Sequence, residues 1–134
     1  KVWLTLQQVG KSGYVKMIRE DIALAKLLFK LAQNHPELEG VTQNLSITTL
    51  RFIPLNFDVN NQDYMNNLNE SIGKELQLGG QVFLSNAIVK EKYCLRGCIV
   101  NFRTSKKDIE EIIEIIVRVG NKIHAELQGN LSRR

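Results

Sequence analysis

Two consecutive apolar runs, separated by a polar Lys-Glu pair, constrain the fold of this chain most strongly. Residues 81–89 and 92–100 each have the length and apolar content of a strand, so the pair predicts an antiparallel hairpin. Isoleucine, valine and glycine then recur at 3.6-residue spacing across residues 109–123, which predicts a helix that begins near Ser105. The segment therefore reads as strand, turn, strand and long amphipathic helix.

The remaining elements follow from the same two periodicities. Apolar residues at helical spacing predict further helices, and alternating β-branched residues predict a further strand. Their predicted ranges are helices at 1–9, 14–34 and 62–78, a strand at 45–53, and a short edge strand at 38–42. The main order is helix, helix, strand, helix, strand, strand, helix. This order predicts a two-layer α+β domain, with helices covering one face of a small antiparallel sheet.

Length and composition indicate one globular domain. The chain has 134 residues, of which 43% are hydrophobic and 24% charged, and this is enough to bury a core. The formal net charge of +4 is spread along the chain, without the basic stripe that nucleic-acid binding usually requires. No apolar run approaches the ~20 residues of a membrane span. We expect residues 1–134 to form a single domain, with residues 128–134 as a polar, frayed tail.

The two cysteines are expected to be free thiols. Cys94 and Cys98 lie four residues apart in one predicted strand, which places them on the same face at about 13 Å separation. A disulfide needs Cα atoms within about 7 Å, so these cysteines should not bridge each other. Two buried free thiols suit a reducing, cytosolic compartment. A metal site is not expected, because His35 and His124 fall in other segments.

Arg96 is the candidate functional residue, because it lies inside an apolar strand. A buried guanidinium needs an anionic partner, since an unpaired buried charge is costly. The partner is either a structural carboxylate, such as Glu75 or Asp108, or a carboxylate ligand that the planar guanidinium grips. The chain contains no nucleophile elbow, phosphate-binding loop or metal-binding helix motif, so we expect no catalytic, cofactor-binding or metal-binding residue within it.

Four segments of the chain, listed below in chain order, together resemble the C-terminal end of the group II pyridoxal-phosphate-dependent amino-acid decarboxylases. That family includes aromatic-amino-acid, glutamate, tyrosine and diaminobutyrate enzymes. The resemblance covers the chain up to about residue 127. The matching segments are Val2–Leu6 with Gly10 and Gly13, Ile18–Ala25, Leu50–Phe52, and Lys92–Thr104 with the helix at 106–120.

The resemblance implies that the chain is the C-terminal small domain of an enzyme with the type I aminotransferase-like fold. It implies pyridoxal 5'-phosphate as cofactor, bound to a lysine that follows a histidine. No His-Lys pair occurs here, so that lysine would lie upstream, in a large domain of the same polypeptide. The family's strand arginine matches Arg96, which the resemblance would place near the substrate carboxylate or at the mouth of the active site. Gly97 stands where the aromatic group has phenylalanine, which affects the expected shape of the pocket.

The implied function is the removal of CO2 from an L-amino acid by a cytoplasmic, dimeric lyase, with this fragment inactive by itself. The resemblance does not select the amino acid. Two alternatives stay open: another enzyme of the same fold, such as an aminotransferase or a different lyase, and a free-standing α+β ligand-binding module. The chain begins inside a helical pattern with no start signal, so we expect a piece of a longer chain.

Overall fold

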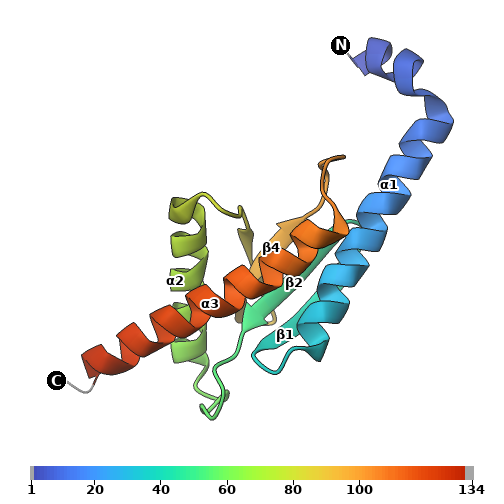
Figure 1. Ribbon diagram of the computed structural model, residues 1–134. Helices are drawn as coiled ribbons and strands as arrows, with labels where there is room; N and C mark the ends of the chain where they lie inside the picture. The colour runs from blue at the N-terminus through green and yellow to red at the C-terminus, as the bar shows by residue number, and fades with distance from the viewer. Residues whose placement is uncertain (1, 132–134) are drawn as a thin grey trace.

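The computed structural model describes residues 2–131 and forms an α+β domain, as the sequence predicts (Figure 1). Single helices alternate with pairs of strands along the chain. The order follows the prediction: the edge strand is present, and the first helix consists of two helices joined at a kink at Gly10. The elements are α1 (Val2–Asn34), β1 (Leu38–Asn44), β2 (Ile47–Phe52), α2 (Gln62–Gly79), β3 (Ser85–Val89), β4 (Lys92–Cys98) and α3 (Lys106–Leu131).

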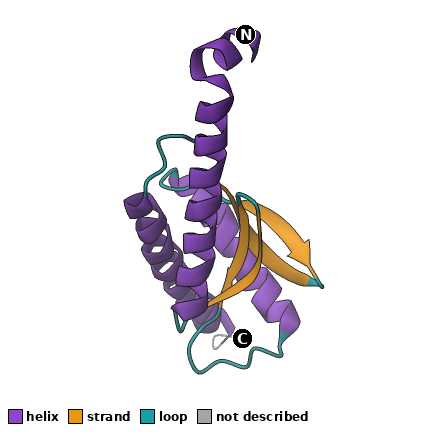
Figure 2. Ribbon diagram, turned by 90° about the vertical axis from the view of Figure 1, so that its right-hand side faces the viewer, coloured by secondary structure: helices purple, strands orange, loops and turns teal. Residues whose placement is uncertain are grey.

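The four strands form one antiparallel sheet in the order β1-β2-β4-β3. Figure 2 shows the strands gathered along one side of the domain, beside α1. Alternation along β2 sends Thr48, Leu50 and Phe52 toward the helices, and Thr48 Oγ1 donates to the Ala25 carbonyl in α1 at 2.7 Å. The opposite face, called the outer face here, carries Thr49 and Arg51 from β2 and every second residue of β4.

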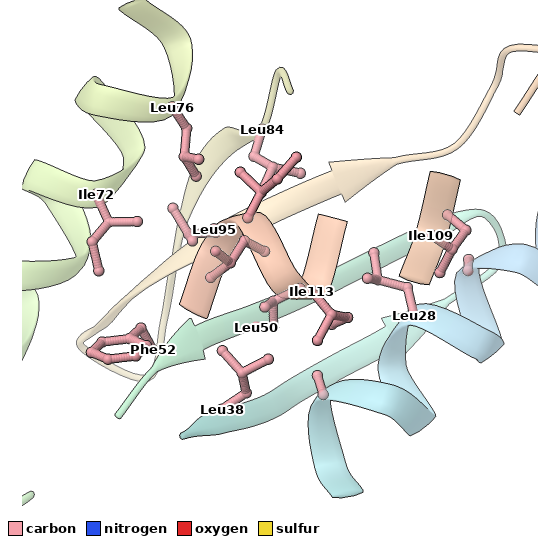
Figure 3. Packing of buried hydrophobic residues seen from close by; sticks show 14 of the residues in the cluster. Leu28, Leu38, Leu50, Phe52, Ile72, Leu76, Leu84, Leu95, Ile109 and Ile113 are labelled. Carbon is pink, nitrogen blue, oxygen red and sulfur yellow. The ribbon is translucent and has the colours of Figure 1, made fainter. Parts of the chain in front are cut away.

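The core lies between the inner sheet face and the three helices (Figure 3). Close packing is clearest where α3 crosses β2: a Cβ atom at Gly120 would lie 2.6 Å from two ring carbons of Phe52. Glycine at this position therefore lets the helix approach the strand. The fully buried members include Leu28 of α1, Leu50 and Phe52 of β2, Ile72 of α2, Leu95 of β4, and Ile109 and Ile116 of α3.

Helix α1 extends well beyond the body of the domain (Figures 1 and 2). Gly10 has φ 68° and ψ 169°, which interrupts the helix where the sequence predicted a break between two helices. Glycine adopts such positive φ values without the cost that a side chain would bring. The projecting part presents apolar side chains to solvent, among them Val2, Trp3, Leu4, Leu6 and Ile18.

Two asparagines of α2 complete the hydrogen bonding where β2 and β4 separate. The paired residues of these strands end at Leu50 and Leu95. Beyond that point, Asn69 Oδ1 accepts from Phe52 N at 2.7 Å, and Asn69 Nδ2 donates to Phe52 O at 3.0 Å. Asn66 Oδ1 accepts from Tyr93 N at 2.8 Å. Side-chain amides therefore replace strand partners and allow the strands to diverge.

Several boundaries differ from the sequence-based ranges. The predicted strand at 81–89 begins only at Ser85, and β4 ends at Cys98. The hairpin turn is tight as predicted, with positive φ at Lys90 (49°) and Glu91 (65°). Helix α3 continues through Leu131, so the helix includes residues 128–131 of the expected tail, and residues 132–134 lie outside the described part of the chain. Fraying of this end stays a prediction.

Candidate functional site

Arg96 lies on the outer face of the sheet, in the middle of β4. It is directly opposite Thr49 of β2 on one side and Ser85 of β3 on the other. Its Nε donates to Ser85 Oγ at 2.9 Å, and Ser85 Oγ donates to the Arg96 carbonyl at 3.3 Å. The serine thus fixes the base of the guanidinium, while the side chain as a whole stays exposed.

The expectation that Arg96 is buried is therefore wrong. Neither proposed partner contacts it. Glu75 pairs with Lys122 at 2.9 Å, and Asp108 caps α3 by accepting from Ser105 N at 2.7 Å. The physical reason is the alternation of the strand: inner residues of β4 face the helices, whereas Arg96 faces outward, where the described residues leave it open to solvent. A free guanidinium on this face suits an external carboxylate better than an internal one.

Among residues 2–131 the buried arginine is Arg51 of β2, for which no role was predicted. Arg51 is 2% exposed, and its Nε lies 2.7 Å from Glu39 Oε2. Glu39 Oε1 in turn lies 2.7 Å from Lys92 Nζ. Period-two counting could have found the cluster, because Arg51 pairs with Glu39 across β1 and β2. That prediction, however, requires the register between β1 and β2, and the sequence indicates β1 only as a short edge strand at 38–42.

The outer face is consequently cationic. Arg51, Lys92 and Arg96 carry positive charge there, and Glu39 is the acidic residue among the paired positions of these strands that face outward. Three cations against one carboxylate leave a formal charge of +2 on this face. Such a surface favours an anionic ligand or an acidic partner surface.

The two cysteines share this face but differ in environment. Both are free, as predicted, but Cys98 is exposed rather than buried. Cys94 is fully buried, and burial raises the pKa of its thiol, an effect that the nearby positive charges of Arg51 and Lys92 oppose. The thiolate is the nucleophilic form of cysteine, so both burial and pKa slow reactions at Cys94.

Thiol labelling should therefore separate the two cysteines. In the native chain at pH 7–8, we expect Ellman's reagent to modify Cys98 quickly and Cys94 at least about tenfold more slowly. Urea should make both react together. Cys98→Ser should remove the fast phase alone. Two equally fast phases in the native chain would contradict the burial of Cys94.

Comparisons with known proteins show which proteins the chain is similar to. No family model matches the chain. The chain is 31% identical over 120 residues to an aromatic-L-amino-acid decarboxylase of Bacillus atrophaeus, covering 89% of this chain and 24% of that relative. It is 26% identical over 123 residues to tyrosine decarboxylase 2 of Arabidopsis thaliana, covering 91% of this chain and 22% of that relative. The chain is thus similar to amino-acid decarboxylases over about nine tenths of its own length. It spans about a quarter of the length of these decarboxylases.

Solved decarboxylase structures share the fold. The glutamate decarboxylase domain of a Vibrio parahaemolyticus protein matches with a TM-score of 0.79 and 21% identity, over 90% of this chain and 25% of that one. Catharanthus roseus tryptophan decarboxylase, solved with L-tryptophan, matches with a TM-score of 0.76 and 22% identity, over 91% of this chain and 25% of that one. The predicted two-layer α+β fold is therefore confirmed. Within residues 2–131, no helix combines the length and apolarity that a membrane span requires.

The departure from the aromatic decarboxylases at Gly97 affects the core rather than the outer face. Gly97 is buried and points inward, away from Arg96. A Cβ atom there would lie 3.1 Å from Leu28 Cδ2 and 3.5 Å from Leu84 Cδ2. Glycine thus lets α1 and the segment before β3 pack closely. The surroundings of the Arg96 guanidinium do not depend on it directly.

The described residues do not form a site for pyridoxal phosphate, the cofactor that the decarboxylase family implies. A lysine that forms an imine at neutral pH usually lies in an apolar setting that lowers its pKa. Every lysine in residues 2–131 is exposed except Lys92, which is ion-paired with Glu39. The pKa values of Lys74 and Lys122 are instead raised by hydrogen bonds to Glu70 and Glu75. These residues do not fit the cofactor.

Proposed function

We propose that this chain is the C-terminal small domain of a pyridoxal-phosphate-dependent amino-acid decarboxylase. Its cofactor lysine would lie in a large domain of the same polypeptide, and the isolated chain would be inactive. The observation that carries the proposal is the 31% identity to a decarboxylase over 120 residues, within a match that spans 24% of that relative. A domain of this size has a core of its own. The remaining three quarters of the relative's length leave room for a catalytic domain.

Arg96 supplies the substrate contact in this proposal. An amino-acid substrate carries a carboxylate, and a guanidinium binds carboxylates through parallel N–H donors. Ser85 holds Arg96 Nε at 2.9 Å, which restricts the side chain before a ligand arrives. The cationic outer face around Arg96 attracts an anionic substrate toward it. Bond cleavage itself depends on the cofactor, which serves as the electron sink when bound.

The large domain would contact two exposed surfaces. One is the outer face around Arg96. The other is the projecting part of α1, where Trp3 is 68% exposed and Leu4 is 65% exposed. Exposed apolar side chains that gather on one element typically mark an interface. We further propose that the parent enzyme is a cytoplasmic homodimer, with an L-amino acid as its substrate.

The test is an assay of the longer polypeptide that contains this chain. We expect that polypeptide, with pyridoxal phosphate, to release CO2 from one or more of the aromatic amino acids, glutamate and diaminobutyrate. The 134-residue chain alone should release none and should retain no stoichiometric cofactor after gel filtration. Amino-group transfer without CO2 release would favour an aminotransferase instead. Cofactor retention by the short chain would contradict its assignment as a small domain.

A further inference from the structure

Arg51 has unusual surroundings for a buried arginine. Its residue is 2% exposed, yet neither Nε nor Nη1 has a hydrogen-bond partner among residues 2–131. The 2.7 Å contact from Nε to Glu39 Oε2 is an ion pair by distance but lacks hydrogen-bond geometry. Buried polar atoms in proteins are almost always hydrogen-bonded, and an unsatisfied charged donor is costly. Because Glu39 Oε2 already faces Nε, Nη1 is the buried donor of the guanidinium that is available to a further acceptor.

The charge around Arg51 is also unbalanced. Glu39 is shared, because its other oxygen lies 2.7 Å from Lys92 Nζ. Asp58, on the loop before α2, does not supply the missing charge. Its Oδ1 instead accepts from the backbone and side-chain nitrogens of Asn60 at 2.9 and 3.0 Å. One carboxylate between two cations leaves a charge of +1 at the cluster. A single additional negative charge would neutralise it.

A cavity borders these groups. Its volume is about 350 Å³, which is within the range of small-molecule sites. Side chains of both kinds line it. Arg51, Lys92, Glu39 and Gln62 form the polar part, and Ile53 and Val59 the apolar part. Lys92 and Glu39 are 35% and 31% exposed, so the polar end reaches solvent. The cavity thus joins an unsatisfied guanidinium to the outer face.

We propose that this cavity binds one carboxylate group, held by Arg51 and Lys92. A carboxylate matches the guanidinium with two acceptor oxygens and brings the single charge that the cluster lacks. A phosphate dianion would bring excess charge next to Glu39. The carboxylate belongs either to a small organic acid or to an Asp or Glu side chain of the parent polypeptide. The site rests on these contacts and does not depend on the decarboxylase assignment.

The test is a titration of the 134-residue chain with sodium acetate, followed by the ¹H–¹⁵N signal of Arg51 Nε. Sodium chloride at equal ionic strength controls for screening. We expect acetate, but not chloride, to shift the signal saturably. Lys92→Met should weaken acetate binding about tenfold, since it removes one charged contact. Lys122→Met removes the same charge from the Glu75 ion pair on α2 and α3 and should leave binding unchanged.

Three results would overturn the site: no shift with acetate, an equal shift with chloride, or equal acetate binding by the Lys92→Met and Lys122→Met variants. The same titration of the longer polypeptide distinguishes the two sources of the carboxylate. If a side chain of the parent occupies the site, the Arg51 signal is already displaced and acetate shifts it no further. If a small acid is the ligand, acetate shifts the signal in both proteins. Both lysine variants retain Arg51, so the same Nε signal is followed in each.

Discussion

Replacement of Asn69 by leucine should lower the free energy of unfolding by roughly 2–5 kcal/mol. Asn69 is fully buried in α2 and bonds to both the amide and the carbonyl of Phe52. Leucine has the branched shape of asparagine but cannot form hydrogen bonds, so the two backbone groups of Phe52 lose their partners. Each unsatisfied buried group costs about 1–3 kcal/mol, which leucine's own burial offsets only in part. Urea unfolding followed by circular dichroism measures the change.

Asn67→Leu provides the matched control, because Asn67 is on the same helix but exposed. It should change the free energy of unfolding by no more than about 0.5 kcal/mol. Asn69→Asp adds a second comparison: it keeps the acceptor for Phe52 N but replaces the donor to Phe52 O with a buried negative charge. A loss for Asn69→Leu no larger than that for Asn67→Leu would show that the amide does not support the end of β2.

The sequence predicted the elements well because their apolar periodicity is strong. In the predicted helix at 62–78, helical spacing places Met65, Leu68, Ile72 and Leu76 on one side, and all four are buried. The burial of Asn69 is not predicted, because a polar residue beside this apolar stripe is expected on the solvent-facing side of the helix. Its burial depends on the divergence of β2 and β4, which involves residues far apart in sequence.

The arginines show the same limit more sharply. Period-two counting places Arg51 and Arg96 on strand faces, and the structure puts both on the outer face. Which of the two is buried depends on neighbours: Glu39 from β1 lies beside Arg51, and Val59 lines the same cavity as Arg51. Arg96 instead has the short Ser85 side chain next to it. The apolar residues around Arg96 in the sequence favour a buried side chain, but the neighbours on adjacent strands determine whether the side chain is buried.

The projecting part of α1 follows from a different cause. Its apolar spacing predicted a helix with a buried stripe, and the helix forms. The stripe finds no partner among residues 2–131, with Val2 75% exposed and Ile18 54% exposed. Apolar spacing in a helix indicates that one face will be covered, but it does not indicate which part of a polypeptide covers that face. Under the proposed function, the large domain covers it.

Arg96→Ala in the longer polypeptide should lower kcat/KM for decarboxylation by about 10- to 150-fold. The estimate corresponds to the loss of a charge-assisted hydrogen-bonded contact of about 1.5–3 kcal/mol. Stability should change by no more than about 0.5 kcal/mol, because Arg96 is exposed and bonds within the chain to Ser85. Arg96→Lys should recover part of the activity, since lysine keeps the charge but loses the planar fork. Steady-state kinetics with thermal unfolding of each variant measures both quantities.

Arg118→Ala is the control for general loss of positive charge. Arg118 is exposed on α3, where its Nη2 donates to Gln81 Oε1 at 2.9 Å, and it lies away from the outer face. It should leave kcat/KM within about twofold of the unmodified enzyme, a difference of well under 1 kcal/mol. Equal losses in Arg96→Ala and Arg118→Ala would assign the effect to overall charge. A fall in stability large enough to explain the lost activity of Arg96→Ala would instead give Arg96 a structural role, and the substrate carboxylate would need a different partner.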